Sequence, residues 1–162
     1  MSDHADAARY AESAGELLLE LRDDESRPPW ALGDAGDALA NRHLLKLLAL
    51  EHPEDRVLSE ESADDRRRLD ADRVWILDPL DGTREFTEPG RNDWAVHVAL
   101  WERERGLTAG AVALPAVGIV LSTAEPPVVP PVDDRPWRVI VSRSRAPVGF
   151  QRAGFPHCAP PP

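Results

Sequence analysis

The chain is 162 residues long, with 42% hydrophobic and 30% charged residues, a size and composition typical of one globular domain. Its formal net charge of −10 argues against a nucleic-acid partner, because phosphate backbones are bound by clustered Lys and Arg. The N-terminus lacks an apolar signal segment, and no apolar run approaches the roughly 20 residues that span a bilayer. We therefore expect a cytoplasmic protein with no membrane partner.

Two helices are predicted in the first third of the chain. Apolar residues recur at helical spacing over residues 5–22. Two prolines and two glycines then interrupt the pattern between residues 26 and 37. We expect the second helix to begin near Asp37, whose side chain would cap it, and to end at Pro53.

Short strands follow these helices. The candidate strands are residues 56–61, 73–78, 94–102, 107–115 and 118–124. This order predicts an α+β fold in which two N-terminal helices pack on a mostly antiparallel sheet.

The C-terminal part of the chain is predicted to be separate. We expect one subdomain over residues 1–125, a proline-rich connector over 126–136, and the start of a second subdomain with an irregular tail over 137–162. The segment 137–143 is a further candidate strand. A sheet that stops there would have an open edge, which predicts self-association through that unfinished sheet.

Residues 77–86 read LDPLDGTREF and carry more carboxylates than a turn needs. Pro79 cannot donate to a sheet ladder, so the strand is predicted to end at Leu77 or Asp78, with Asp78 and Asp81 on the turn that follows. A short helix starting at Gly82 would offer free amides to an anion. Acidic groups beside an anion site repel a phosphate unless a divalent ion such as Mg²⁺ bridges them.

A second acidic pair, Glu60 and Glu61, ends the preceding candidate strand. If the two strands are neighbours and end on the same side, Glu60 lies close to Asp78, and like charges so close are costly without a metal. The alternative is that these aspartates form turns and the glutamates are a solvated edge. Spacing alone leaves both interpretations open. His97, in the middle of a candidate strand, is interpreted as a packing or surface residue.

Several of these segments resemble a known family. The stretch WILDPLDGTREF, residues 75–86, resembles the signature of the inositol monophosphatase superfamily of Mg²⁺-dependent phosphatases. VLSEES, residues 57–62, resembles that family's Glu-Glu motif, and residues 94–101 resemble the strand that follows. Arg-Glu-Phe at 84–86 is similar to the 3'(2'),5'-bisphosphate nucleotidases of this superfamily. The resemblance implies the N-terminal subdomain of a layered α/β sugar-phosphatase fold.

The resemblance also implies a set of metal ligands. Glu60 would ligate the catalytic Mg²⁺ ions and Asp78 would bridge two of them. The backbone carbonyl of Leu80 would complete the first site, and Asp81 would serve the second.

Catalytic and substrate-binding roles follow from the same resemblance. Thr83 would orient the attacking water, with Asp37 hydrogen-bonded behind it. The amides of Gly82 and Thr83 would hold the scissile phosphate. The implied reaction is in-line hydrolysis of the 3'-phosphate of adenosine 3',5'-bisphosphate, a small phosphorylated substrate of sulfur assimilation. Hydrolysis of an inositol phosphate is the alternative.

One part of the family pattern has no counterpart in the sequence. The family's second half supplies a Trp-Asp motif whose aspartate is another metal ligand, and none of the five tryptophans here is followed by Asp. The resemblance fades after Arg145. We therefore expect a truncated product of a nucleotidase gene, and a catalytically inactive fragment is a third interpretation.

Overall fold

The computed structural model describes residues 2–24, 28–129 and 131, and the chain up to Val128 forms one compact unit. Two long helices, α1 (Asp3–Arg22) and α2 (Pro29–Glu51), come first. The strands are β1 (Arg56–Ser59), β2 (Arg73–Asp81), β3 (Ala95–Glu102), β4 (Gly106–Leu114) and β5 (Ile119–Ser122). Three short helical segments connect them: η1 (Arg66–Asp70), α3 (Thr83–Thr87) and η2 (Pro115–Val117).

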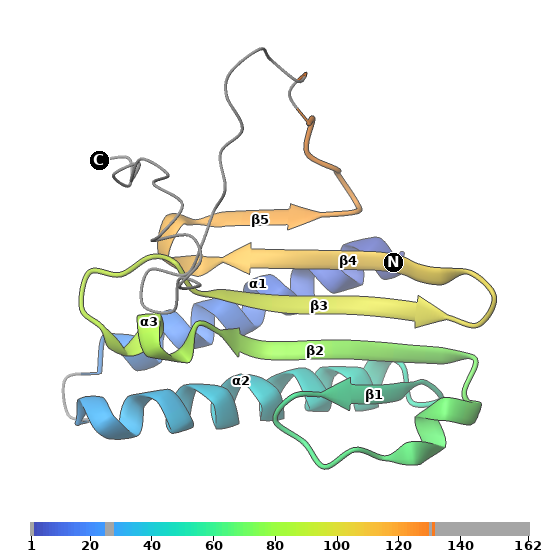
Figure 1. Ribbon diagram of the computed structural model, residues 1–162, viewed down its shortest axis with the longest axis horizontal. Coiled ribbons are helices and arrows are strands. Elements are labelled where there is room, and N and C mark those ends of the chain that lie inside the picture. Colours follow the sequence, from blue (N-terminus) through green and yellow to red (C-terminus); the bar gives the residue numbers. More distant parts are fainter. Residues whose placement is uncertain (1, 25–27, 130, 132–162) are drawn as a thin grey trace, which may run out of the picture. The chain divides into compact units, whose positions relative to one another are not determined.

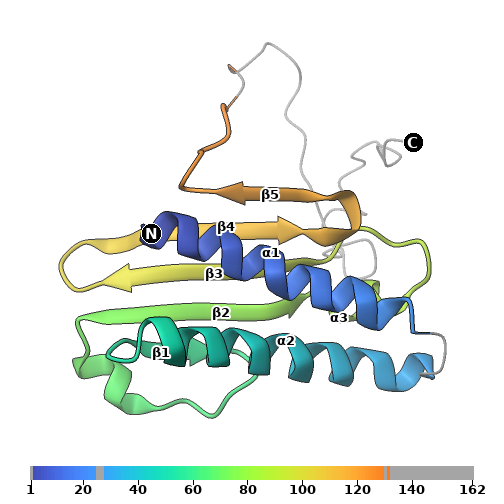
Figure 2. The same cartoon turned by 180° about the vertical axis from the view of Figure 1, so that it is seen from behind.

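The five strands form one sheet in the order β1-β2-β3-β4-β5 (Figure 1). β1 pairs with β2 in parallel, and the other three pairs are antiparallel. Helices α1 and α2 both lie on one face of the sheet (Figure 2), with α1 over β3 and β4 and α2 over β2. The predicted α+β fold with a mostly antiparallel sheet is confirmed.

The core lies between the helices and the sheet. α1 begins after Ser2, whose hydroxyl caps it by accepting from the Ala5 amide at 3.3 Å. Its buried face carries Tyr10 and Leu18 between the small residues Ala7, Ala11, Ala14 and Gly15, and these small residues let the helix approach the strands closely. The largest fully buried side chains of the core are Trp75, Trp94, Tyr10, Phe86, Leu18 and Leu44.

α2 begins eight residues before the predicted start near Asp37. Pro28 is extended and occupies the cap position, and Pro29 opens the first turn, where a proline costs no intrahelical hydrogen bond. The glycines inside this helix serve close packing. A Cβ on Gly33 would lie 2.9 Å from Cγ2 of Thr83, and one on Gly36 would lie 2.9 Å from Cε1 of Phe86. Asp37 is therefore an interior residue of α2 and not its cap.

β2 also runs beyond its predicted end. It continues to Asp81, but its register against β3 shifts between Asp78, which lies opposite His97, and Asp81, which lies opposite Ala95. The irregularity contains Pro79, so the missing amide coincides with a break in the ladder and does not end the strand.

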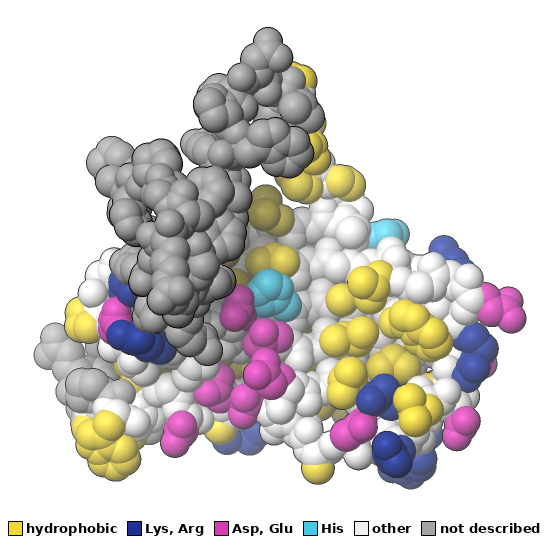
Figure 3. Space-filling model, viewed as in Figure 1, with side chains coloured by type: hydrophobic (Ala, Val, Ile, Leu, Met, Phe, Trp, Pro, Cys, Tyr) yellow, Lys and Arg dark blue, Asp and Glu magenta, His cyan; other side chains and the backbone are white. Residues whose placement is uncertain are grey.

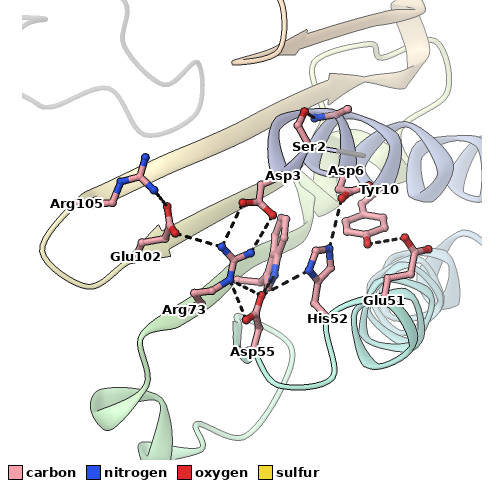
Figure 4. Close-up of polar contacts among 12 residues, drawn as sticks. Ser2, Asp3, Asp6, Tyr10, Glu51, His52, Asp55, Arg73, Glu102 and Arg105 are labelled. Atoms are coloured by element: carbon pink, nitrogen blue, oxygen red, sulfur yellow. Dashed lines mark hydrogen bonds and ion pairs between the residues drawn. The ribbon is translucent and has the colours of Figure 1, made fainter.

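An ion-pair network joins four elements at the start of β2. The Arg73 guanidinium contacts Asp3 at 2.9 Å, Asp55 at 3.0 Å and Glu102 at 3.2 Å (Figure 4). Asp55 also accepts a hydrogen bond from Nε1 of Trp75 at 2.9 Å. The hydrogen bond from Arg73 lowers the pKa of Asp3. This network ties the start of α1 and the entry to β1 to the sheet.

The remaining predictions concern the C-terminal part of the chain. Residues 126–129 and 131 have no regular secondary structure. The candidate strand at 137–143 and the tail after it lie outside the described residues. Among the described helices, none is both long enough and apolar enough to cross a membrane.

Candidate metal site at the end of strand β2

The parallel pairing of β1 and β2 brings the two acidic motifs together. Ser59 pairs with Leu77, and the amide of the next residue, Glu60, donates to the carbonyl of Leu77 at 3.2 Å. Glu60 therefore leaves β1 directly beside Asp78 on β2. This is the arrangement expected of adjacent strands that end on the same side.

Asp78, Asp81 and His97 form a compact group of potential ligands. Each residue offers one potential ligand atom, and these three atoms all lie within 4.8 Å of one another. His97 Nε2 is 3.3 Å from a carboxylate oxygen of Asp81, and both side chains are accessible to solvent. The space-filling view shows acidic side chains gathered in one cluster next to a histidine (Figure 3).

Negative charge accumulates around this group, and its effect appears in the pKa values of Asp78 and Asp37. Burial raises the pKa of Asp78, and the charges of Glu60 and Asp81 raise it further, while His97 lowers it. Burial also raises the pKa of Asp37 to about 7, helped by Glu61 and three further carboxylates nearby. Within the described part of the chain, no Lys or Arg forms an ion pair with Asp37, Asp78 or Asp81.

The backbone after Asp81 has a conformation that requires glycine. Gly82 has a φ of 82° in the left-handed region and is the N-cap of α3. A Cβ there would lie 3.1 Å from the carbonyl oxygen of Asp93. Both the torsion angle and the close contact disfavour a larger residue at the start of α3.

Thr83 differs from its expected arrangement. Its hydroxyl donates to the carbonyl of Leu80 at 3.1 Å, and among the described residues it makes no hydrogen bond to Asp37. α2 meets Thr83 through Gly33 instead. The Leu80 carbonyl lies between the two aspartates, in the irregular part of β2.

A hollow of about 250 Å³ extends the acidic site along α2. It is lined by Asp34, Asp37, Ala38, Asn41, Arg42 and Glu61. The side chain of Asn41 fixes one wall, since it donates to Ser62 Oγ at 3.0 Å and accepts from Ser59 Oγ at 2.8 Å. These bonds attach the end of β1 to α2.

Sequence reasoning missed part of this site. His97 was interpreted as a packing or surface residue, yet it lies directly opposite Asp78 in the sheet. The alternation of side chains along β3 places His97 on the face away from the helices. Only the register of β2 against β3 brings His97 next to the carboxylates. Asp34 and Glu61 belong to motifs visible in the sequence, and nothing in those motifs shows that they face one hollow.

The donor set fits a hard divalent cation. Carboxylate and carbonyl oxygens are the ligands that Mg²⁺ prefers, and a bound cation would stabilise Asp78, whose pKa is raised by burial and by the charges of Glu60 and Asp81. A second group, Asp3, Asp6 and His52, is equally compact. There, however, Arg73 already pairs with Asp3 and Arg9 with Asp6. The uncompensated group at the end of β2 is the better candidate.

Comparison with known proteins shows the family of the chain. The chain matches the inositol monophosphatase family over residues 17–126 and belongs to that family. It is similar to two proteins named 3'-phosphoadenosine 5'-phosphate phosphatase. The Mycobacterium leprae protein is 58% identical over 127 residues, 73% of this chain and 47% of the relative. The Mycobacterium tuberculosis protein is 50% identical over 151 residues, 86% of this chain and 55% of the relative.

A solved structure, Mycobacterium tuberculosis SuhB, resembles the fold with a TM-score of 0.61 and 28% identity. That match covers 74% of this chain and 43% of the SuhB chain. The chain spans about half the length of the curated relatives it matches.

Proposed function

We propose that this chain carries the metal-binding part of a Mg²⁺-dependent phosphatase that removes the 3'-phosphate from adenosine 3',5'-bisphosphate. One observation carries the proposal: several carboxylates from α2, β1 and β2 converge at one end of the sheet, and no Lys or Arg among the described residues is paired with Asp37, Asp78 or Asp81. The names of the two mycobacterial relatives support the substrate.

The proposed metal ligands are Asp78, Asp81, Glu60 and the carbonyl oxygen of Leu80. Bound Mg²⁺ would neutralise charge on the phosphate and lower the pKa of a water molecule. The mutual repulsion that raises the pKa of Asp78 supports its place as the central ligand. His97 adjoins Asp81 and would orient that carboxylate through its Nε2.

Thr83 and Asp37 are proposed to serve the attacking water. Because the Thr83 hydroxyl gives its own proton to Leu80, its oxygen is left to accept a hydrogen bond from water. Asp37, with a pKa of about 7, would take up a proton near neutral pH. The backbone amides of Gly82 and Thr83, at the start of α3, would contact the phosphate.

The wider setting is also a proposal. We place the metal-binding subdomain at residues 1–125, the connector at 126–136 and the start of a second subdomain at 137–162. The partner would be a nucleotide bisphosphate in cytoplasmic sulfate assimilation, with no nucleic acid bound. The outer edge of β5, with Ile119 and Leu121 exposed, supports self-association. Sedimentation of the purified chain tests that last point, and a monomer at all concentrations would contradict it.

The decisive experiment measures phosphate release from adenosine 3',5'-bisphosphate with and without Mg²⁺. The test variant is Asp81→Asn, and Asp64→Asn is a matched control, because Asp64 is also exposed and pairs with Arg68 outside the site. We expect Mg²⁺-dependent release that Asp81→Asn abolishes and Asp64→Asn leaves intact. Inositol 1-phosphate serves as the competing substrate. Faster hydrolysis of inositol 1-phosphate would overturn the proposed substrate. If phosphate release does not exceed that of Asp81→Asn, the chain by itself is inactive.

A further inference from the structure

Trp30 stands out among the tryptophans because its indole is 84% exposed, whereas Trp75 and Trp94 are almost completely buried in the core. It occupies the second position of α2. The preceding cap residue, Pro28, has φ −70° and ψ 142°, and Pro29 opens the helix. Prolines restrict the backbone here, so the indole is presented from a rigid helix start and not from a loose end.

Helical geometry places Trp30 on the same face of α2 as the acidic site. Asp34, Asp37 and Asn41 follow it by four, seven and eleven residues, spacings that return to one face of a helix. All three of those residues line the hollow beside the carboxylate cluster. Trp30 precedes Asp37 by two turns, which corresponds to about 10 Å along the helix axis.

The same end of α2 is in contact with α3. The Cα of Gly33, three residues after Trp30, packs so closely on Thr83 and Thr87 that a Cβ would lie 2.9 Å and 3.4 Å from their methyl carbons. This contact keeps the first turns of α2 next to the segment that follows the two aspartates. Trp30 therefore lies about one helical turn from the residue of α2 that packs against the start of α3.

We propose that Trp30 is a specificity residue that stacks on the purine base of a nucleotide whose phosphate lies at Asp78 and Asp81. This inference rests on the proposed function. The hollow that begins one helical turn after Trp30 is lined by three carboxylates and Arg42, and a neutral flat group such as a base avoids the repulsion of those carboxylates. An indole offers the largest flat apolar surface of any side chain, and aromatic stacking tolerates small differences in geometry.

The test compares two ligands that share a phosphate monoester and differ in the base. Dissociation constants of adenosine 3',5'-bisphosphate and inositol 1-phosphate are measured by calorimetry in Mg²⁺ for the full chain and three variants. Trp30→Ala should weaken binding of the nucleotide about tenfold and leave inositol 1-phosphate unchanged. Trp30→Phe should restore most of the loss, because it keeps an aromatic face.

Leu50→Ala is the matched control. Leu50 is also an exposed apolar residue of α2, at 70% exposure, but twenty residues after Trp30 it points to the opposite face of the helix. It should change neither dissociation constant. Circular dichroism confirms that each variant is folded, which we expect because the indole of Trp30 contributes little to the core.

The outcomes separate this inference from the function on which it rests. An equal loss for both ligands in Trp30→Ala, or no loss for either, overturns the stacking role alone. Failure of the unmodified chain to bind either ligand in a Mg²⁺-dependent manner overturns the proposed function, and the stacking role with it.

Discussion

The two ends of strand β2 use the same acidic residue types in opposite ways. At its start, Arg73 lies among three carboxylates and contacts each of them. At its end, about 26 Å away for a nine-residue strand, Asp78 and Asp81 lie among further carboxylates with one histidine nearby. Arg73 lowers the pKa of Asp3 at the first end, whereas burial and like charges raise that of Asp78 at the second.

This difference supports a structural role for the first cluster and the proposed metal-binding role for the second. We call the first cluster balanced because each of its carboxylates contacts an arginine. Such a cluster joins separate elements and contributes to folding. An unbalanced cluster costs free energy in the folded chain, and such a cost is typical of functional sites, where a ligand offsets it. Charge balance, rather than the number of acidic residues, distinguishes the two ends.

The largest effect is expected from breaking the balanced end. Arg73→Leu would leave Asp3 and Asp55 without their arginine and Glu102 with Arg105 alone, and Asp55 and Glu102 are largely shielded from water. We expect a loss of about 3–4 kcal/mol in the free energy of unfolding, measured by urea denaturation. Arg105→Leu is the control. It also pairs with Glu102, but its side chain is mostly exposed, so the loss should stay below about 1 kcal/mol. Equal losses would contradict the central role of Arg73.

At the acidic end, we expect the free energy of unfolding to depend on backbone geometry and not on ion pairs. Gly82→Ala places a side chain at a φ of 82° and against the carbonyl of Asp93, so we expect a loss of about 2–3 kcal/mol. Gly90→Ala has a similar φ of 76° with open space around it, so only the torsional cost of about 1 kcal/mol remains. Thermal denaturation of both variants measures the difference. If the two variants lose the same stability, the contact with Asp93 is unimportant.

A bound cation should stabilise the acidic end of β2, as Arg73 stabilises the other end. Mg²⁺ at about thirty times its dissociation constant would raise the free energy of unfolding by about 2 kcal/mol through binding to the folded state. Asp78→Asn should remove this increase, whereas Asp3→Asn at the other end should keep it. Calorimetric melting with and without Mg²⁺ makes the comparison. An increase that survives in Asp78→Asn would place the cation elsewhere.

The smallest effect is a pH dependence of opposite sign at the two ends, measured in a chelator. The pKa of Asp37 is about 7 in the folded chain against an ordinary value of 3.8, so the folded state holds an extra proton between these values. Stability from this proton is complete below about pH 4 and is lost as the pH rises through 7. We expect the chain to gain about 1 kcal/mol between pH 8 and pH 5, and Asp37→Asn to lack this gain.

Asp3 provides the contrast in the same titration. Its pKa is lowered by Arg73, so its contribution is present above its ordinary value of 3.8 and is lost as the pH falls through the lower folded value. Acid unfolding below about pH 4 should therefore be shared by the original chain and Asp37→Asn. A gain toward pH 5 that persists in Asp37→Asn would assign it to another group.

Local patterns were sufficient for much of the fold and for the central motif. The helical spacing over residues 5–22 and the alternation in the strands are properties of short segments, because they follow from periods of 3.6 and 2 residues. The stretch 75–86 contains its carboxylates, its glycine and its turn within a few residues. The sequence by itself therefore determined the α+β class and the presence of closely spaced carboxylates and a glycine at the end of a buried strand.

Tertiary structure decided the rest, because it depends on contacts between distant segments. α2 begins at Pro29 because its glycines pack against Thr83 and Phe86 of α3. Local helix propensity does not include the stability that this tertiary contact provides. His97 joins the site only through the register of β3 against β2, and Asp37 acquires its raised pKa only from burial near carboxylates of other elements. The fold also decided which acidic cluster contains an arginine, because Arg73 and Asp3 are seventy residues apart in the sequence.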